Sequence, residues 1–151
     1  MQRWIAAGVV TLILLMSGAG AGWYYYKQSR PYPVWVPLKI NPTLSNEKRE
    51  EIIKTLKTKL AEREILLKVS QDVGLKGKWH LASDEEGARQ IGERLFVELG
   101  EADSPMGKVP SINIGVKGTK RELGVSGEIS MRLMHDVWKI LGIKLPSKQG
   151  G

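Results

Sequence analysis

Two histidines are the side chains of this chain best suited to acid–base or metal chemistry. His80 follows Trp79 and precedes a predicted helix, and His135 lies beside Asp136 on the predicted last helix. Neighbouring residues on a helix point to different sides, so His135 and Asp136 do not face each other. A metal site made from both histidines and carboxylates would need tertiary proximity, which nothing in the spacing indicates.

Other kinds of catalysis find no matching motif. The 151 residues include no cysteine, which excludes disulfides, thiol nucleophiles and cysteine metal ligands. The chain has no G-x-S-x-G, Walker loop or dinucleotide-binding fingerprint. Acidic residues cluster in the first turns of predicted helices, where capping explains them. We therefore expect no enzymatic activity, no cofactor and no metal.

The charge pattern argues against nucleic-acid binding. The formal charge is +7, and Arg3, Lys27 and Arg30 are the only charges in the first thirty residues. The rest of the chain has 20 basic against 16 acidic residues, with the two signs interleaved. Nucleic-acid binders usually concentrate basic charge on one face. We expect no nucleic-acid partner.

The N-terminal segment has the pattern of a membrane anchor. Residues 4–22 carry no charge, and at about 1.5 Å per residue a helix of this length covers roughly the 30 Å bilayer core. Amphipathic aromatic rings favour the headgroup level of a bilayer. The predicted membrane-interface anchors are Trp4 at one end and Trp23, Tyr24, Tyr25 and Tyr26 at the other. We predict an anchor over residues 1–27 with a short cytoplasmic end.

Cleavage and orientation of this segment both remain open. A cleaved signal peptide would have Arg3 before the apolar core and Ala19-Gly20-Ala21 as its cleavage site. The positive-inside rule alone leans against export, since Lys27 and Arg30 follow the span. Many N-terminal anchors nevertheless leave the bulk of the chain outside. We predict a single-pass inner-membrane protein with its soluble domain on the periplasmic side.

The rest of the chain predicts one small domain. Residues 28–33 form a Pro-rich linker, residues 34–145 the domain and residues 146–151 a flexible tail. VWVPLKI at 34–40 predicts an edge strand. A stripe of apolar residues from 52 to 73, interrupted at 61–64, predicts one bent helix or two, ending at Gly74.

Capping patterns place the remaining helices. Ser83 with Glu86 and Thr119 with Glu122 form predicted capping boxes that open a short helix and the last helix. Residues 95–99 and 111–117 predict a strand pair joined by a long loop. The fold class is therefore α/β, of the α+β sandwich type. A small mixed sheet carries one long, one short and one C-terminal helix, preceded by the transmembrane helix.

This order, with LLKVSQDVGLKGKW inside it, resembles the periplasmic domain of the polysaccharide chain-length determinant (Wzz-type) family. The likeness covers residues 34–141 and rests on core-type positions. The family-motif positions are Val69, Val73, Leu75 and Trp79 at the end of the long helix, Ala88 and Leu95 in the short helix, Ile112, Ile114 and Val116 in the second strand, and Leu123, Ile129 and Ser130 in the last helix.

Three departures limit what the resemblance implies. Met131 stands where the family has Asn, and Gly124 where it has Ala. The long helical hairpin, the second span and any kinase region of such proteins are not in this chain. The resemblance therefore implies a base domain with an assembly or scaffold role in O-antigen or exopolysaccharide synthesis or export, in truncated form.

The predicted partners follow from the same reading. They are a second copy of the chain or a fuller co-polymerase or polymerase, and the lipid bilayer through the N-terminal helix. Lys76 and Lys78 form a possible basic contact loop for an acidic neighbour or an anionic glycan, although exposed lysines are usually only solvated. The alternatives are a ring-building oligomerisation module of an envelope or secretion complex and an accessory glycan- or small-ligand-binding module.

Overall fold

The computed structural model describes residues 20–105 and 107–143. Residues 20–28 are helical and lead into the domain. The elements that follow are β1 (Pro31–Lys39), α2 (Asn46–Leu60), α3 (Arg63–Val73), α4 (Leu75–Lys78), α5 (Asp84–Arg94), β2 (Leu95–Ser104), β3 (Gly107–Thr119), the 3₁₀ turn η1 (Lys120–Glu122) and α6 (Leu123–Ile140).

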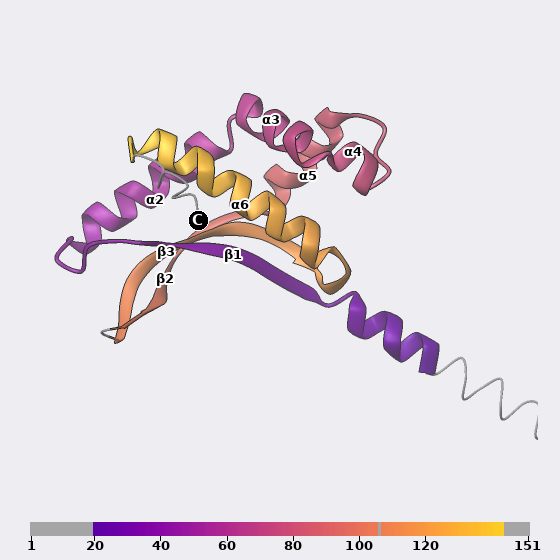
Figure 1. Ribbon diagram of the computed structural model, residues 1–151, viewed down its shortest axis with the longest axis horizontal. Coiled ribbons are helices and arrows are strands. Elements are labelled where there is room, and N and C mark those ends of the chain that lie inside the picture. Colours follow the sequence, from indigo (N-terminus) through magenta and orange to yellow (C-terminus); the bar gives the residue numbers. More distant parts are fainter. Residues whose placement is uncertain (1–19, 106, 144–151) are drawn as a thin grey trace, which may run out of the picture.

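The three strands form one antiparallel sheet in the order β1-β3-β2. The prediction of a mixed sheet was wrong, because β3 lies between β1 and β2 and runs opposite to both. Figure 1 shows the helices gathered on one side of this sheet, with α6 lying along it. The domain therefore has two layers, and no helix of the described residues lies on the second face of the sheet.

The predicted transmembrane helix is not supported. Within residues 20–105 and 107–143, no helix combines the length and the apolar character needed to cross a bilayer. Residues 4–19 of the predicted span, including Trp4, lie outside the described residues, as does the predicted tail. The localisation inferred from that span stays a prediction.

The first strand begins earlier than predicted. Pro31 already pairs with Thr119, and the register continues to Lys39 opposite Ser111. Half of the predicted linker 28–33 therefore belongs to the sheet. Proline is compatible with this position because β1 is an edge strand.

The long apolar stripe forms two helices. The Ser45 side chain caps α2 by accepting a hydrogen bond from the Lys48 N–H at 3.4 Å. α2 ends at Leu60, and α3 begins at Arg63 after a break of two residues. Gly74 ends α3 in the left-handed conformation (φ 72°), as predicted for a glycine at this position.

The two strands after α5 pair along a much longer hairpin than predicted. The register runs from Leu95 opposite Val116 to Ser104 opposite Gly107, so the two strands pair over almost their whole length. Gly107 has φ 108°, which a residue with a side chain rarely adopts. The predicted long loop is therefore mostly strand.

One core lies between the sheet and the helices. Its fully buried side chains include Leu56, Leu60, Val69, Leu75, Ile91, Ile112, Ile114, Ile129, Leu133 and Val137. α6 is fixed to the sheet by the Ser130 hydroxyl, which donates a hydrogen bond to the Val34 carbonyl in β1 (2.9 Å). α5 packs closely on α3, since a Cβ on Gly87 would lie 2.2 Å from Ser70 Oγ.

Candidate functional site

The face of the sheet opposite the helices is a candidate interaction surface. Because side chains alternate along a strand, the residues that share this face follow from the register. We call it the open face. Its central part comprises Pro33, Trp35, Pro37, Lys39, Phe96, Glu98, Asn113, Gly115 and Lys117, and the buried Ser111 lies beside Lys39 in the register. Trp35 is 46% exposed on it. A large aromatic side chain exposed on a face without a helix layer indicates a contact surface.

Gly115 lies at the centre of the open face. In the register it stands between Trp35 on β1 and Phe96 on β2. Phe96 is buried although no helix covers it, and the Lys117 ammonium lies 6.0 Å from its ring centre. A Cβ on Gly115 would lie 1.9 Å from the Val34 carbonyl oxygen. The absence of a side chain at Gly115 therefore permits the backbones of β1 and β3 to approach closely at this position.

The two edges of the sheet are poorly suited to adding another strand. β1 has prolines at the odd-numbered positions 31, 33 and 37. Backbone groups of alternate residues point to the same side of a strand, so these prolines all remove N–H donors from one side. In an edge strand that side is the one facing away from the sheet, where a further strand would have to pair. β2 carries the acidic side chains of Glu98, Glu101 and Asp103, which discourage pairing between edges. An association of this domain therefore fits the open face better than an edge.

Most family-motif positions lie in the core, but Leu123 is 44% exposed. Leu95, predicted in the short helix, is instead the first residue of β2. Val69, Val73, Leu75, Ile112, Ile114 and Ile129 are all buried. Trp79 is partly buried and packs against this core, while the Arg94 guanidinium lies 4.8 Å from its ring centre. These side chains hold the fold together and present no group for chemistry.

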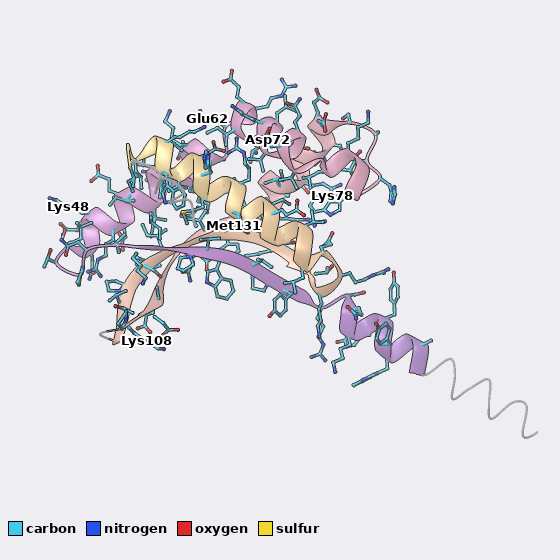
Figure 2. All side chains as sticks on the ribbon, viewed as in Figure 1. Lys48, Glu62, Asp72, Lys78, Lys108 and Met131 are labelled. Carbon is cyan, nitrogen blue, oxygen red and sulfur yellow. The ribbon has the colours of Figure 1, made fainter. Side chains whose placement is uncertain are left out.

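The predicted basic contact loop is a short helix, α4, with its two lysines in different settings. Lys78 forms an ion pair with Glu128 of α6 across the domain surface, and Figure 2 shows its position beside α6. Lys76 is exposed. The two ammonium groups therefore do not act as one free basic patch.

A cavity of about 540 Å³ opens beside the C-terminal end of α4. It lies at the end of the domain that helix 20–28 adjoins. It is lined by Ser29, Lys78, Trp79, His80, Leu81, Gln90, Thr119, Arg121 and Glu122. His80 has φ 53°, a conformation in which glycine is favoured. The lining joins segments far apart in the sequence, so no spacing of residues along the chain predicts this cavity.

Glu122 holds one wall of this cavity. It accepts hydrogen bonds from the N–H and the hydroxyl of Thr119 (2.9 Å each) and from Arg94 (3.0 Å), which completes the predicted capping box. Burial alone would raise the pKa of Glu122, but these hydrogen bonds outweigh it and lower the pKa. The carboxylate is therefore a structural anion already matched by Arg94.

Replacing Glu122 by Gln is expected to reduce the free energy of unfolding by about 1 kcal/mol at neutral pH. A carboxyl group whose pKa is lower in the folded state stabilises the fold above its unfolded pKa, and that contribution is lost as pH falls through the folded pKa. The difference between wild type and variant should therefore shrink below about pH 4. Urea unfolding at a series of pH values checks this, and a difference independent of pH would contradict it.

The two histidines do not come together as a site. His80 lines the cavity, whereas His135 lies on α6 beside Trp138, with ring centres 6.4 Å apart. In the part of the chain that the structure describes, no group of three or more His, Asp or Glu side chains could hold a metal ion. Asp136 instead pairs with Arg132 on its own helix (2.7 Å).

The described interface aromatics surround helix 20–28. Their exposed fractions are 68% for Trp23, 66% for Tyr24, 63% for Tyr25 and 61% for Tyr26. Figure 2 shows side chains projecting from this helix on several sides. Two arginines contact these rings, Arg30 at 5.3 Å from the Tyr26 centre and Arg121 at 5.4 Å from the Tyr25 centre.

Comparisons of the chain with protein-family models, with curated proteins and with solved structures each returned no match. The function therefore has to be argued from the open face, the cavity and the aromatic helix.

Proposed function

We propose that this chain is a non-catalytic scaffold domain that assembles with itself, in the manner of a Wzz-like base domain in cell-surface polysaccharide synthesis or export. The observation that carries the proposal is the open face, with Trp35 exposed on a sheet that has helices on its other side only. An exposed aromatic beside buried Phe96 forms the centre of a surface that a partner would cover.

A second copy of the chain suits this face. The open face carries charges of both signs, with Lys39 and Lys117 on β1 and β3 and Glu98 on β2. A surface with both signs can match itself across a two-fold axis, because Glu98 of each copy can then meet a lysine of the other copy. The blocked strand edges favour face-to-face packing over strand addition.

The order of elements supports the polysaccharide part of the proposal. The first strand β1, the helices α2 to α5, the strand pair β2 and β3 and the last helix α6 follow the order strand, helices, strand pair, helix that the Wzz-type resemblance implies. Ser130, one of the positions of that resemblance, bonds α6 to β1. The expected partners are a second copy or a fuller co-polymerase.

A ring-building module of another envelope complex is the second candidate. The same open face favours it, since both functions require self-association. The two differ in what accompanies the assembly, so co-purifying glycan supports the first and co-purifying secretion proteins support the second.

Replacing Trp35 by Glu is expected to shift the full-length protein from an oligomer to a monomer. The introduced carboxylate would be buried without a partner in the centre of the contact. Sedimentation velocity in a mild detergent measures the change, and circular dichroism checks that the fold is retained.

Met131→Glu is the matched control. Met131 is 60% exposed on α6, in the helical layer, and Figure 2 labels it there. The same charge added at this position should leave the oligomer intact. Equal behaviour of the two variants would count against the open face as the contact.

A further inference from the structure

The aromatic side chains of helix 20–28 are arranged around its axis rather than along one stripe. Successive residues of an α-helix are about 100° apart, so Trp23, Tyr24, Tyr25 and Tyr26 point in four directions. All four are more than 60% exposed. A protein partner would cover one side of such a helix, whereas a lipid interface surrounds it. Tyr and Trp rings also favour the headgroup level of a bilayer.

Basic side chains lie beside these rings without acidic partners. Lys27, Arg30 and Arg121 form no ion pair with any described residue. The guanidinium groups of Arg30 and Arg121 lie over tyrosine rings, which holds their positions and leaves their N–H donors available. Lys78 and Arg94 nearby are paired with glutamates and are not available in this way.

Arg121 joins the aromatic helix to the cavity of the domain. It lines the 540 Å³ cavity, and it also lines a second cavity of about 370 Å³ with Tyr24, Tyr25 and Gln28. One free guanidinium is thus presented to two hollows at the point where the helix meets the domain. The distance of 96 residues between Tyr25 and Arg121 shows that the fold, not local sequence, creates this arrangement.

We infer that this end of the molecule binds the headgroup of an anionic phospholipid at a bilayer surface, with Arg121 contacting the phosphate. The planar guanidinium can donate two parallel hydrogen bonds to a phosphate group. The Tyr25 ring packs against this guanidinium. Lys27 and Arg30 add electrostatic attraction to a negatively charged bilayer surface. The side chains of His80 and Gln90 offer further donors for the polar part of a headgroup.

Glu122 does not oppose this binding. Its carboxylate lines the same cavity, but Arg94 and Thr119 already supply its hydrogen bonds. Its charge is matched locally, so the free cation of Arg121 sets the preference of the cavity for an anion.

The test uses the full-length protein in micelles of a zwitterionic detergent, titrated with phosphatidylglycerol or with phosphatidylcholine. A lipid that binds only the folded state raises the midpoint of thermal unfolding. We expect phosphatidylglycerol to raise the midpoint and phosphatidylcholine to leave it unchanged. Arg121→Gln should weaken the apparent affinity for phosphatidylglycerol about tenfold, and Arg121→Lys should weaken it less.

Lys120→Gln is the matched control, since it removes the same charge from the neighbouring residue, which lines neither cavity. Wild-type affinity in this variant supports a specific contact of Arg121. An equal loss in both variants, or no loss in Arg121→Gln, would overturn the inference. Glycerol 1-phosphate in solution tests the source of the phosphate. If it raises the midpoint over the same concentration range as phosphatidylglycerol, the cavity binds a soluble phosphate ester and the lipid assignment is wrong.

Discussion

Replacing Gly115 by Ala is expected to destabilise the domain by about 3 kcal/mol or more. The added methyl group would lie 1.9 Å from the Val34 carbonyl oxygen and 2.6 Å from the Trp35 Cα. Both atoms belong to the backbone, so no side chain can rotate away and β1 would have to separate from β3. Urea unfolding followed by circular dichroism gives the free energy.

Gly127→Ala is the control for this substitution. Gly127 lies within α6, and a Cβ there would meet nothing within 4 Å. Alanine is favoured over glycine in a helix, so this variant should be more stable by about 0.5–1 kcal/mol. A Gly115→Ala protein as stable as wild type would show that the two strands do not approach as closely as described.

Replacing Arg132 by Ala is expected to cost about 2–3 kcal/mol of unfolding free energy. Arg132 Nε donates a hydrogen bond to Asp72 of α3 (2.7 Å), and Nη1 lies 2.7 Å from Asp136 of α6. Asp136 is only 8% exposed, so removal of the guanidinium leaves a buried carboxylate without its partner. The two helices also lose their link. The midpoint and slope of urea unfolding check the loss.

The double variant Arg132→Leu with Asp136→Leu separates these effects. It removes both buried charges together and fills their space with apolar atoms, which is often close to neutral in stability. We expect it to recover most of the loss. A double variant as unstable as Arg132→Ala would contradict the explanation by an unpaired carboxylate.

The local signals in the sequence predicted helix ends well. Gly74 ends α3 in the left-handed region, the Ser83 side chain caps α5 by accepting from the Glu86 N–H, and Thr119 with Glu122 forms a capping box. Each of these features depends on a few neighbouring residues, so the sequence contains all the information needed.

Features that depend on distant pairing were predicted less well. The segment between 100 and 110 is rich in turn formers, yet most of it is strand. The pairing itself explains the difference, because Gly100 makes room for the Asn113 side chain and Lys108 forms an ion pair with Glu101 (3.3 Å). Tertiary contacts thus override local preference.

Neither the open face nor the cavity lined by Arg121 could be predicted from the sequence. Trp35 is flanked by Val34 and Val36, and Phe96 by Leu95 and Val97, so the sequence is apolar on both faces of these strands. Only the arrangement of layers shows which of the two faces the described helices cover. Arg121 contacts Tyr25, although most of the domain sequence separates the two residues. Periodicity reports that a face is apolar but not which element lies on it.

The mass of the full-length protein in a mild detergent, determined by light scattering after size exclusion with the detergent subtracted, tests the proposed self-assembly most directly. A single species of two or more subunits is the predicted result. A monomer at every protein concentration measured would contradict self-assembly as the function of the open face.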